Sequence, residues 1–214
     1  MHGRGIPQHY VLALGLVLIA SLLLVLPVMR SEHGGWSWQF FLLGAGFMLL
    51  ETKSIIQLAL LWGSTWVVAS LAIASILVMA LVGNWIVARR SVQRPWVVGA
   101  ILLGLLAVSY AVPVGRIGFQ SLTAESVFYA GLLFSPVLCA GLLFGSAIAQ
   151  STSIARDYGT NLLGAMAGGI AEYLSLQTGY RTLILVIAAC YLGALLARPK
   201  IATATTARVP STAP

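Results

Sequence analysis

Residues 40–66 read FFLLGAGFMLLETKSIIQLALLWGSTW, and this stretch decides the class of fold. Its only charged residues are Glu51 and Lys53. An apolar run of this kind suits a helix that crosses a bilayer, which takes about 20 residues. The Gly-Ser-Thr cluster between Trp62 and Trp66 is typical of a turn at the membrane surface, where tryptophan side chains gather. The stretch therefore predicts a membrane helix that ends in a turn.

The rest of the chain has the same apolar character. Its 214 residues are 59% hydrophobic and 8% charged, and the mean hydropathy is +0.96. Because a soluble domain carries about 25% charged residues, this composition predicts an integral membrane protein. The residues left between the apolar runs are too few for a Rossmann fold or another sizeable soluble catalytic domain within this chain.

Charged and Gly/Pro-rich breaks divide the sequence into apolar segments. We predict an all-α fold, a polytopic transmembrane helix bundle of about 6–7 spans. It forms a single domain over residues 1–197, and a disordered tail follows at 198–214. Pro95 suits the first turn of a helix, and Pro136 predicts a kink within one. The predicted spans cover residues 10–30, 37–61, 65–88, 95–113, 126–150, 159–176 and 180–197.

The basic residues predict an orientation in the membrane. The chain has 12 Lys+Arg against 5 Asp+Glu, a formal charge of +7. In the predicted topology most of the basic residues fall on one side of the bundle. The positive-inside rule then favours a cytoplasmic C-terminus. Basic residues placed between apolar runs indicate contact with the lipid bilayer, so we expect no nucleic-acid partner.

Glu51 and Lys53 are the first candidate site residues. A charge near the middle of a span costs a few kcal/mol or more unless it is compensated. At about 100° per residue the two side chains point to nearly opposite sides of the helix, so we do not expect them to pair. Gly44 shares the face of Glu51, and Gly46 shares the face of Lys53, so a second helix can approach either face closely.

Two interpretations are open for these charges. Glu51 is either a proton or cation site on a transport path, or a polar clamp that fixes the register of packed helices. Lys53 either supplies a counter-charge in such a path or has a structural role, and it can also extend toward the lipid headgroups if the helix is shifted along its axis.

A second group of candidates lies in residues 155–181, ARDYGTNLLGAMAGGIAEYLSLQTGYR. Spacings of three, four and seven place its small and polar residues on one helical face. This groove either packs against the 37–61 helix or lines a substrate cavity, and the GxxxG pair within it is typical of close helix packing. The face contains Asn161, Gly164, Ala165, Gly168, Gly169 and Glu172.

No pattern of catalytic or metal-ligating residues is visible in the sequence. His2, His9 and His33 lack ligand spacing. Cys139 and Cys190 lie inside apolar runs without a CxxC pattern or a neighbouring histidine. There is also no Ser-His-Asp set. We therefore expect no metal and no cofactor, and we do not expect this chain to be an enzyme by itself.

Four segments resemble, in this order, the C-terminal membrane region of bacterial spermidine synthase-like (polyamine aminopropyltransferase-like) multi-spanning membrane proteins. The combination of LLETKSI with NLLGAMAGG is the most specific part of the resemblance. The segments are GRGIPQHYVLAL (3–14), WQFFLLGAGFMLLETKSIIQLALLWGSTWVV (38–68), FSPVLCAGLLFGSAIA (134–149) and YGTNLLGAMAGGIAEYLSLQTGYRTLILVIAACYLGALL (158–196).

The resemblance implies a membrane module that lies in the inner (plasma) membrane of a bacterium and accompanies a Rossmann-type domain. This sequence has no glycine-rich strand-loop-helix and no acidic aminopropyltransferase signature, so only membrane positions carry over: Glu51, Lys53, Asn161 and Glu172. The Rossmann-type domain is expected as a partner in trans, or as a part lost by truncation. A cytoplasmic domain joined before residue 10 would require an internal N-terminus, opposite to the orientation that the basic residues favour.

Three functions are therefore considered. The first is a membrane anchor or scaffold for a Rossmann-type partner domain. The second is half of a transporter or permease, with Glu51 and Glu172 flanking a midplane carboxylate site for a cation or a polyamine. The third is an accessory subunit of a membrane complex.

Overall fold

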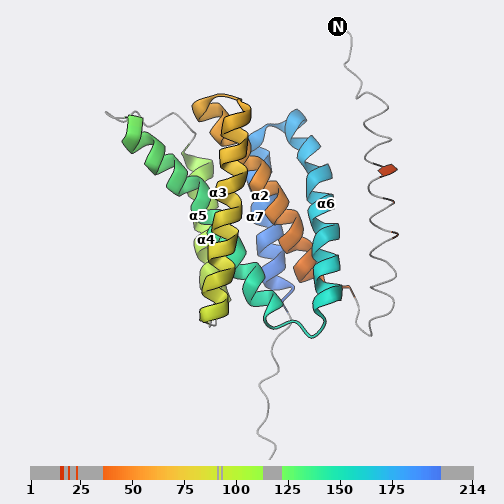
Figure 1. Ribbon diagram of the computed structural model, residues 1–214. Coiled ribbons are helices and arrows are strands. Elements are labelled where there is room, and N and C mark those ends of the chain that lie inside the picture. The colour runs from red at the N-terminus through yellow and green to blue at the C-terminus, as the bar shows by residue number, and fades with distance from the viewer. Residues whose placement is uncertain are drawn as a thin grey trace, which may run out of the picture.

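A computed structural model describes residues 15–16, 19, 23, 36–90, 92, 94–112 and 122–198, with side chains at these positions except 122–127, 173–178 and 180. Six α-helices make up most of the described part of the chain after residue 36, which contains no strand (Figure 1). Their bounds are α2 Trp38–Trp62, α3 Trp66–Arg89, α4 Pro95–Ala111, α5 Leu122–Ile148, α6 Ile154–Thr178 and α7 Tyr180–Leu196.

The all-α class predicted from the sequence is confirmed for this part of the chain. The helices lie close to the predicted segments, although α6 begins at Ile154 rather than at residue 159. Pro95 is in the first turn of α4, and Pro136 lies inside α5. The predicted span at 10–30 and the predicted tail fall largely outside the described residues.

The structure supports part of the predicted number of spans. Three of the described helical segments are both long and apolar enough to cross a membrane: α2, α3 and residues Phe128–Ile148 of α5. Helices α4 and α7 are apolar but have only 17 residues each. Helix α6 is long enough, but it carries Arg156, Asp157 and Glu172. Length and composition therefore indicate a membrane-embedded protein without establishing a bundle of 6–7 spans.

The turn between α2 and α3 forms where the sequence predicts it. Gly63 ends α2 with φ of 89°, a left-handed value that glycine adopts without the strain of a side chain. The Thr65 side chain then caps α3 by accepting a hydrogen bond from the Val68 backbone N–H (3.3 Å). These two residues reverse the chain, so α2 and α3 pack side by side.

Helix α2 is the hub of the bundle. It packs most extensively against α6 and also contacts α3, α5 and α7 (Figure 1). The main core gathers around Leu49 and Leu50 of α2, which are almost completely buried together with side chains from α3, α4, α5 and α7. The polar residues that interrupt α2 therefore lie inside the bundle, where other helices surround them.

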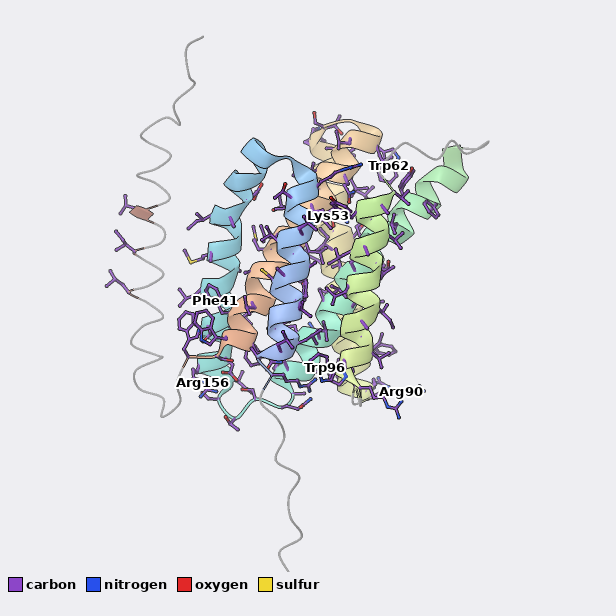
Figure 2. The ribbon with its side chains drawn as sticks, turned by 180° about the vertical axis from the view of Figure 1, so that it is seen from behind. Phe41, Lys53, Trp62, Arg90, Trp96 and Arg156 are labelled. Carbon is purple, nitrogen blue, oxygen red and sulfur yellow. The ribbon has the colours of Figure 1, made fainter. Side chains whose placement is uncertain are left out.

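All six tryptophans are exposed, and they gather at the two ends of the bundle. Figure 2 shows Trp62 at one end and Trp96 at the other. Trp66 follows the turn next to Trp62, while Trp36 and Trp38 lie where α2 begins, at the end that holds Trp96. Two aromatic belts separated by apolar helices are typical of a protein that sits across a bilayer.

Basic residues concentrate at one end, which we call the basic end. It contains Arg90 and Arg156, which lie beside Trp96 in Figure 2. Arg89, at the end of α3, lies next to Arg90 in the chain. Arg198, just after α7, belongs to the same end because it donates a hydrogen bond to Gln150 near Arg156.

Candidate functional site

The polar centre of α2 consists of Glu51, Thr52, Lys53 and Ser54. Four consecutive residues point in four directions around a helix, so each side chain faces a different neighbour. Thr52, Lys53 and Ser54 are buried, whereas Glu51 is half-buried. At 1.5 Å per residue, Glu51 lies roughly 20 Å along the axis from Trp38, deep within the membrane-crossing length of α2.

Glycines bring α2 and α6 into backbone contact, and we call this contact the α2–α6 seam. A Cβ atom at Gly164 would collide with the backbone carbonyl of Phe41, and one at Gly44 would collide with that of Asn161. A Cβ at Gly168 would lie 2.7 Å from the carbonyl oxygen of Ala45. Any larger residue at these three positions would force the helices apart, as in other close packings of membrane helices.

Two hydrogen bonds join α2 and α6 along the seam. The Asn161 side-chain amide donates to the backbone carbonyl of Phe40 (3.2 Å). The Thr52 hydroxyl donates to a carboxylate oxygen of Glu172 (3.1 Å). Asn161 and Glu172, which the sequence places at the two ends of one small-residue face, therefore both bond to α2. Each bond provides a partner for a polar group that would be costly to leave alone in lipid.

The other two glycines predicted to pack do not belong to the closest part of the seam. Gly46 faces α7, since a Cβ there would lie 3.0 Å from the Tyr191 ring. A Cβ at Gly169 would meet only the end of Met48, at 4.0 Å. Of the five glycines predicted to pack, three lie in the α2–α6 seam: Gly44, Gly164 and Gly168. Gly46 lies against α7, and Gly169 has only a loose contact.

Lys53 is the most unusual member of the polar centre. Its side chain is 0% exposed, and its ammonium nitrogen has no hydrogen-bond partner among the described residues. Figure 2 shows it inside the bundle, in the half nearer to Trp62. A lysine that extended to the headgroups would be exposed, so the structure does not support that interpretation. An unpaired buried charge costs several kcal/mol, and it usually marks a functional site.

Three further buried polar groups were missed at the level of the sequence. Gln57 lies one turn beyond Lys53 on the same face of α2, and its side-chain oxygen is buried without a hydrogen-bond partner in the described structure. The same holds for the hydroxyl groups of Ser109 on α4 and Tyr191 on α7. Gln57 could have been predicted from the sequence, because its spacing of four residues from Lys53 places both side chains on one helical face. A single hydroxyl in an apolar helix gives no such pattern.

The side chains at this site determine which interactions it can make. Cys139 and Cys190 are free thiols on α5 and α7. The described residues contain no group of three or more His, Cys, Asp or Glu side chains that would hold a metal ion. The polar centre of α2 combines a carboxylate, an ammonium group and two hydroxyl groups, which suit ionic contacts and hydrogen bonds.

Comparison with protein-family models, curated proteins and solved structures finds no match for this chain. The role of the site therefore has to be argued from its own geometry. That geometry separates two sets of polar groups. Those of the α2–α6 seam have hydrogen-bond partners, whereas the Lys53 ammonium and the Gln57 side-chain oxygen have none among the described residues.

Proposed function

We propose that this chain is an integral membrane module that anchors or scaffolds a soluble Rossmann-type partner domain. The observation that carries the proposal is where the two most specific segments of the resemblance lie in the fold. LLETKSI (49–55) belongs to α2 and NLLGAMAGG (161–169) belongs to α6, the two helices that pack most extensively. Thr52 in the first segment and Asn161, Gly164 and Gly168 in the second serve helix packing, which is what a rigid membrane platform requires.

We also propose that all six described helices cross the membrane. A helix of 17 residues is about 25 Å long, close to the thickness of a bacterial hydrocarbon core, so α4 and α7 can span with little adjustment. Helix α6 packs along α2 and is carried across the bilayer with it. The basic end then faces the cytoplasm of a bacterium, and the chain after α7 emerges on that side.

The native protein in its own membranes tests the anchor function. An antibody against residues 201–214 reports its size, and cross-linking followed by purification reports its partner. We expect either a fused protein several times larger than 22.6 kDa that contains a Rossmann-type domain, or a 22.6 kDa protein in stoichiometric complex with one. A 22.6 kDa protein that purifies without any such partner after cross-linking would overturn the proposal.

A transporter half is the second candidate, and the observation that favours it is the absence of a partner for Lys53 within the described structure. Transporters place unpaired polar groups near the midplane to bind substrates. Two features disfavour a polyamine as the substrate. Glu172 bonds to Thr52 in the α2–α6 seam, and a buried ammonium at Lys53 would repel a cation. This candidate requires the chain alone to show saturable uptake.

The third candidate, an accessory subunit of a membrane complex, is distinguished by the same cross-linking experiment. It requires membrane-embedded partners in place of a Rossmann-type domain.

A further inference from the structure

Two cavities lie one above the other where α2, α5 and α6 meet near the basic end. The outer cavity has a volume of about 340 Å³, and the inner one has a volume of about 190 Å³. The outer cavity is lined mainly by polar and charged side chains, including Gln150, Ser151, Arg156, Asp157 and Arg198. The inner cavity is mostly apolar, with Leu43, Phe47, Ala140, Phe144 and Ala165 in its wall.

Three aromatic rings separate the two cavities. Phe40 lines the outer cavity, whereas Phe144 and Tyr158 line the inner one. The rings contact each other edge to face, with centroids 6.3 Å apart for Phe40 and Phe144 and 6.4 Å apart for Phe144 and Tyr158. The two cavities are thus neighbours on either side of these rings, and polar side chains are more frequent in the lining of the cavity nearer the basic end.

The outer cavity has an excess of positive charge. Asp157 pairs with Arg156 (2.8 Å) and accepts a hydrogen bond from Ser151 (2.7 Å), so the Asp157 charge is balanced within the cavity. Arg198 donates to the neutral side chain of Gln150 (2.9 Å). Burial lowers the pKa of Arg198 from its ordinary value, yet a guanidinium stays protonated at neutral pH. Among the described residues of the cavity, the Arg198 charge therefore has no carboxylate partner and is left for an anionic ligand.

The inner cavity opens toward the lipid. Tyr158 at its edge is 51% exposed, and Asn84 on α3 is exposed at the opposite edge. Helices α5 and α6 contact each other only sparsely, so the crevice between them is not closed by helix packing. Apolar cavities of about 150 Å³ hold a molecule of the size of benzene, so the inner cavity can take several carbons of an acyl chain.

We propose that this crevice is a binding site for an anionic phospholipid. Arg198 holds the phosphate in the outer cavity, at the depth of the headgroups. One acyl chain enters beside Tyr158 and places part of its length in the inner cavity. An anionic phospholipid fits both cavities together. A free anion would not fill the apolar inner cavity, and a neutral lipid would not pair with the Arg198 charge.

Lipid binding to the detergent-purified chain tests the site. Thermal unfolding is followed during titration with dioleoyl phosphatidylglycerol, dioleoyl phosphatidylcholine and inorganic phosphate in separate arms. We expect a saturable rise in Tm with phosphatidylglycerol, an affinity at least tenfold weaker for phosphatidylcholine, and no protection by phosphate at matched concentrations. Equal effects of the two lipids, or protection by phosphate alone, would overturn the proposal.

Matched variants locate the binding. Arg198→Gln should weaken phosphatidylglycerol binding about tenfold, because it removes a charge-assisted contact, and Arg198→Lys should restore most of it. Arg94→Gln removes a charge near the same end but outside both cavities, and it should have little effect. Equal losses in Arg198→Gln and Arg94→Gln would show diffuse surface attraction and would contradict the site.

The inner chamber is tested by filling it. Ala165→Leu should weaken phosphatidylglycerol binding, whereas Ala107→Leu, at an exposed position on α4, should not. Unchanged binding by a folded Ala165→Leu protein would exclude the acyl-chain chamber. If Ala165→Leu fails to fold, Ala140→Val fills the same chamber with a smaller change and is judged by the same result.

Discussion

At the residue scale, the buried side chains in the polar centre of α2 are of two kinds: two have hydrogen-bond partners, and one has none among the described residues. Thr52 bonds across to Glu172, and the Ser54 hydroxyl donates to the Leu50 carbonyl of its own helix (2.8 Å). Lys53, between them, is completely buried without a hydrogen-bond partner among the described residues. Packing explains Thr52 and Ser54, so Lys53 is the residue whose substitution is most informative.

Replacing Lys53 with methionine should stabilise the isolated protein. The change keeps an unbranched side chain of similar length and removes a buried group without a partner, a replacement that can yield about 1–4 kcal/mol. We expect a higher Tm in detergent, measured by thermal unfolding. Leu49→Met, at a fully buried neighbour, controls for methionine itself. A Lys53→Met protein less stable than Leu49→Met would show that Lys53 has a stabilising partner, contrary to this account.

Thr52→Val should weaken the α2–α6 seam slightly. It removes the hydroxyl that bonds to Glu172, and such bonds between membrane helices average about 0.6 kcal/mol. Ser54→Ala removes a hydroxyl bonded only within α2, so it should change the stability of the seam less. A double-mutant cycle with Glu172→Ala, which removes the acceptor, measures the coupling directly. A coupling energy of zero would contradict the bond between the two helices.

At the element scale, the packing of α2 against α6 depends on glycines rather than on large apolar side chains. Backbone meets backbone at Gly44 and Gly164, so there is no flexible side chain to move aside. Helix α7 packs on α2 differently, with the Tyr191 ring against Gly46. The first contact is therefore far less tolerant of added atoms than the second.

Two alanine substitutions on α6 test this difference. Gly164→Ala places a methyl group against the Phe41 carbonyl and should lower stability by about 1–3 kcal/mol, the usual cost of overpacking. Gly169→Ala meets only Met48 at 4.0 Å and should be neutral or slightly stabilising, because alanine favours a helix more than glycine does. Thermal unfolding of both variants gives the comparison. Equal stability of the two variants would contradict a backbone-close seam.

At the scale of the whole molecule, the two aromatic belts and the basic end predict a single orientation. Cysteines introduced as Ser64→Cys and Arg90→Cys, in a Cys139→Ala/Cys190→Ala background, mark the two ends. In intact bacterial cells, a membrane-impermeant maleimide should label Ser64→Cys, at the turn opposite the basic end, and spare Arg90→Cys. The reverse labelling pattern would contradict a cytoplasmic basic end.

Helix positions could be predicted because charged residues, glycine and proline interrupt an otherwise apolar chain. The face from Asn161 to Glu172 could be predicted as well, since helical spacing defines a face. Periodicity does not identify the neighbour of each face, so Gly46 against α7 was not foreseen. The burial of Lys53 and the cavities at the basic end depend on how several helices meet, and no single segment encodes them.

The central claim is that the polar residues of α2 and α6 hold these helices together as a membrane platform and do not line a transport path. Uptake of labelled spermidine by proteoliposomes containing only this chain tests it most directly. We expect uptake no faster than in protein-free liposomes, both for the wild type and for a folded Glu51→Gln variant. Saturable uptake by the wild type that disappears in Glu51→Gln would contradict the claim and establish a transporter.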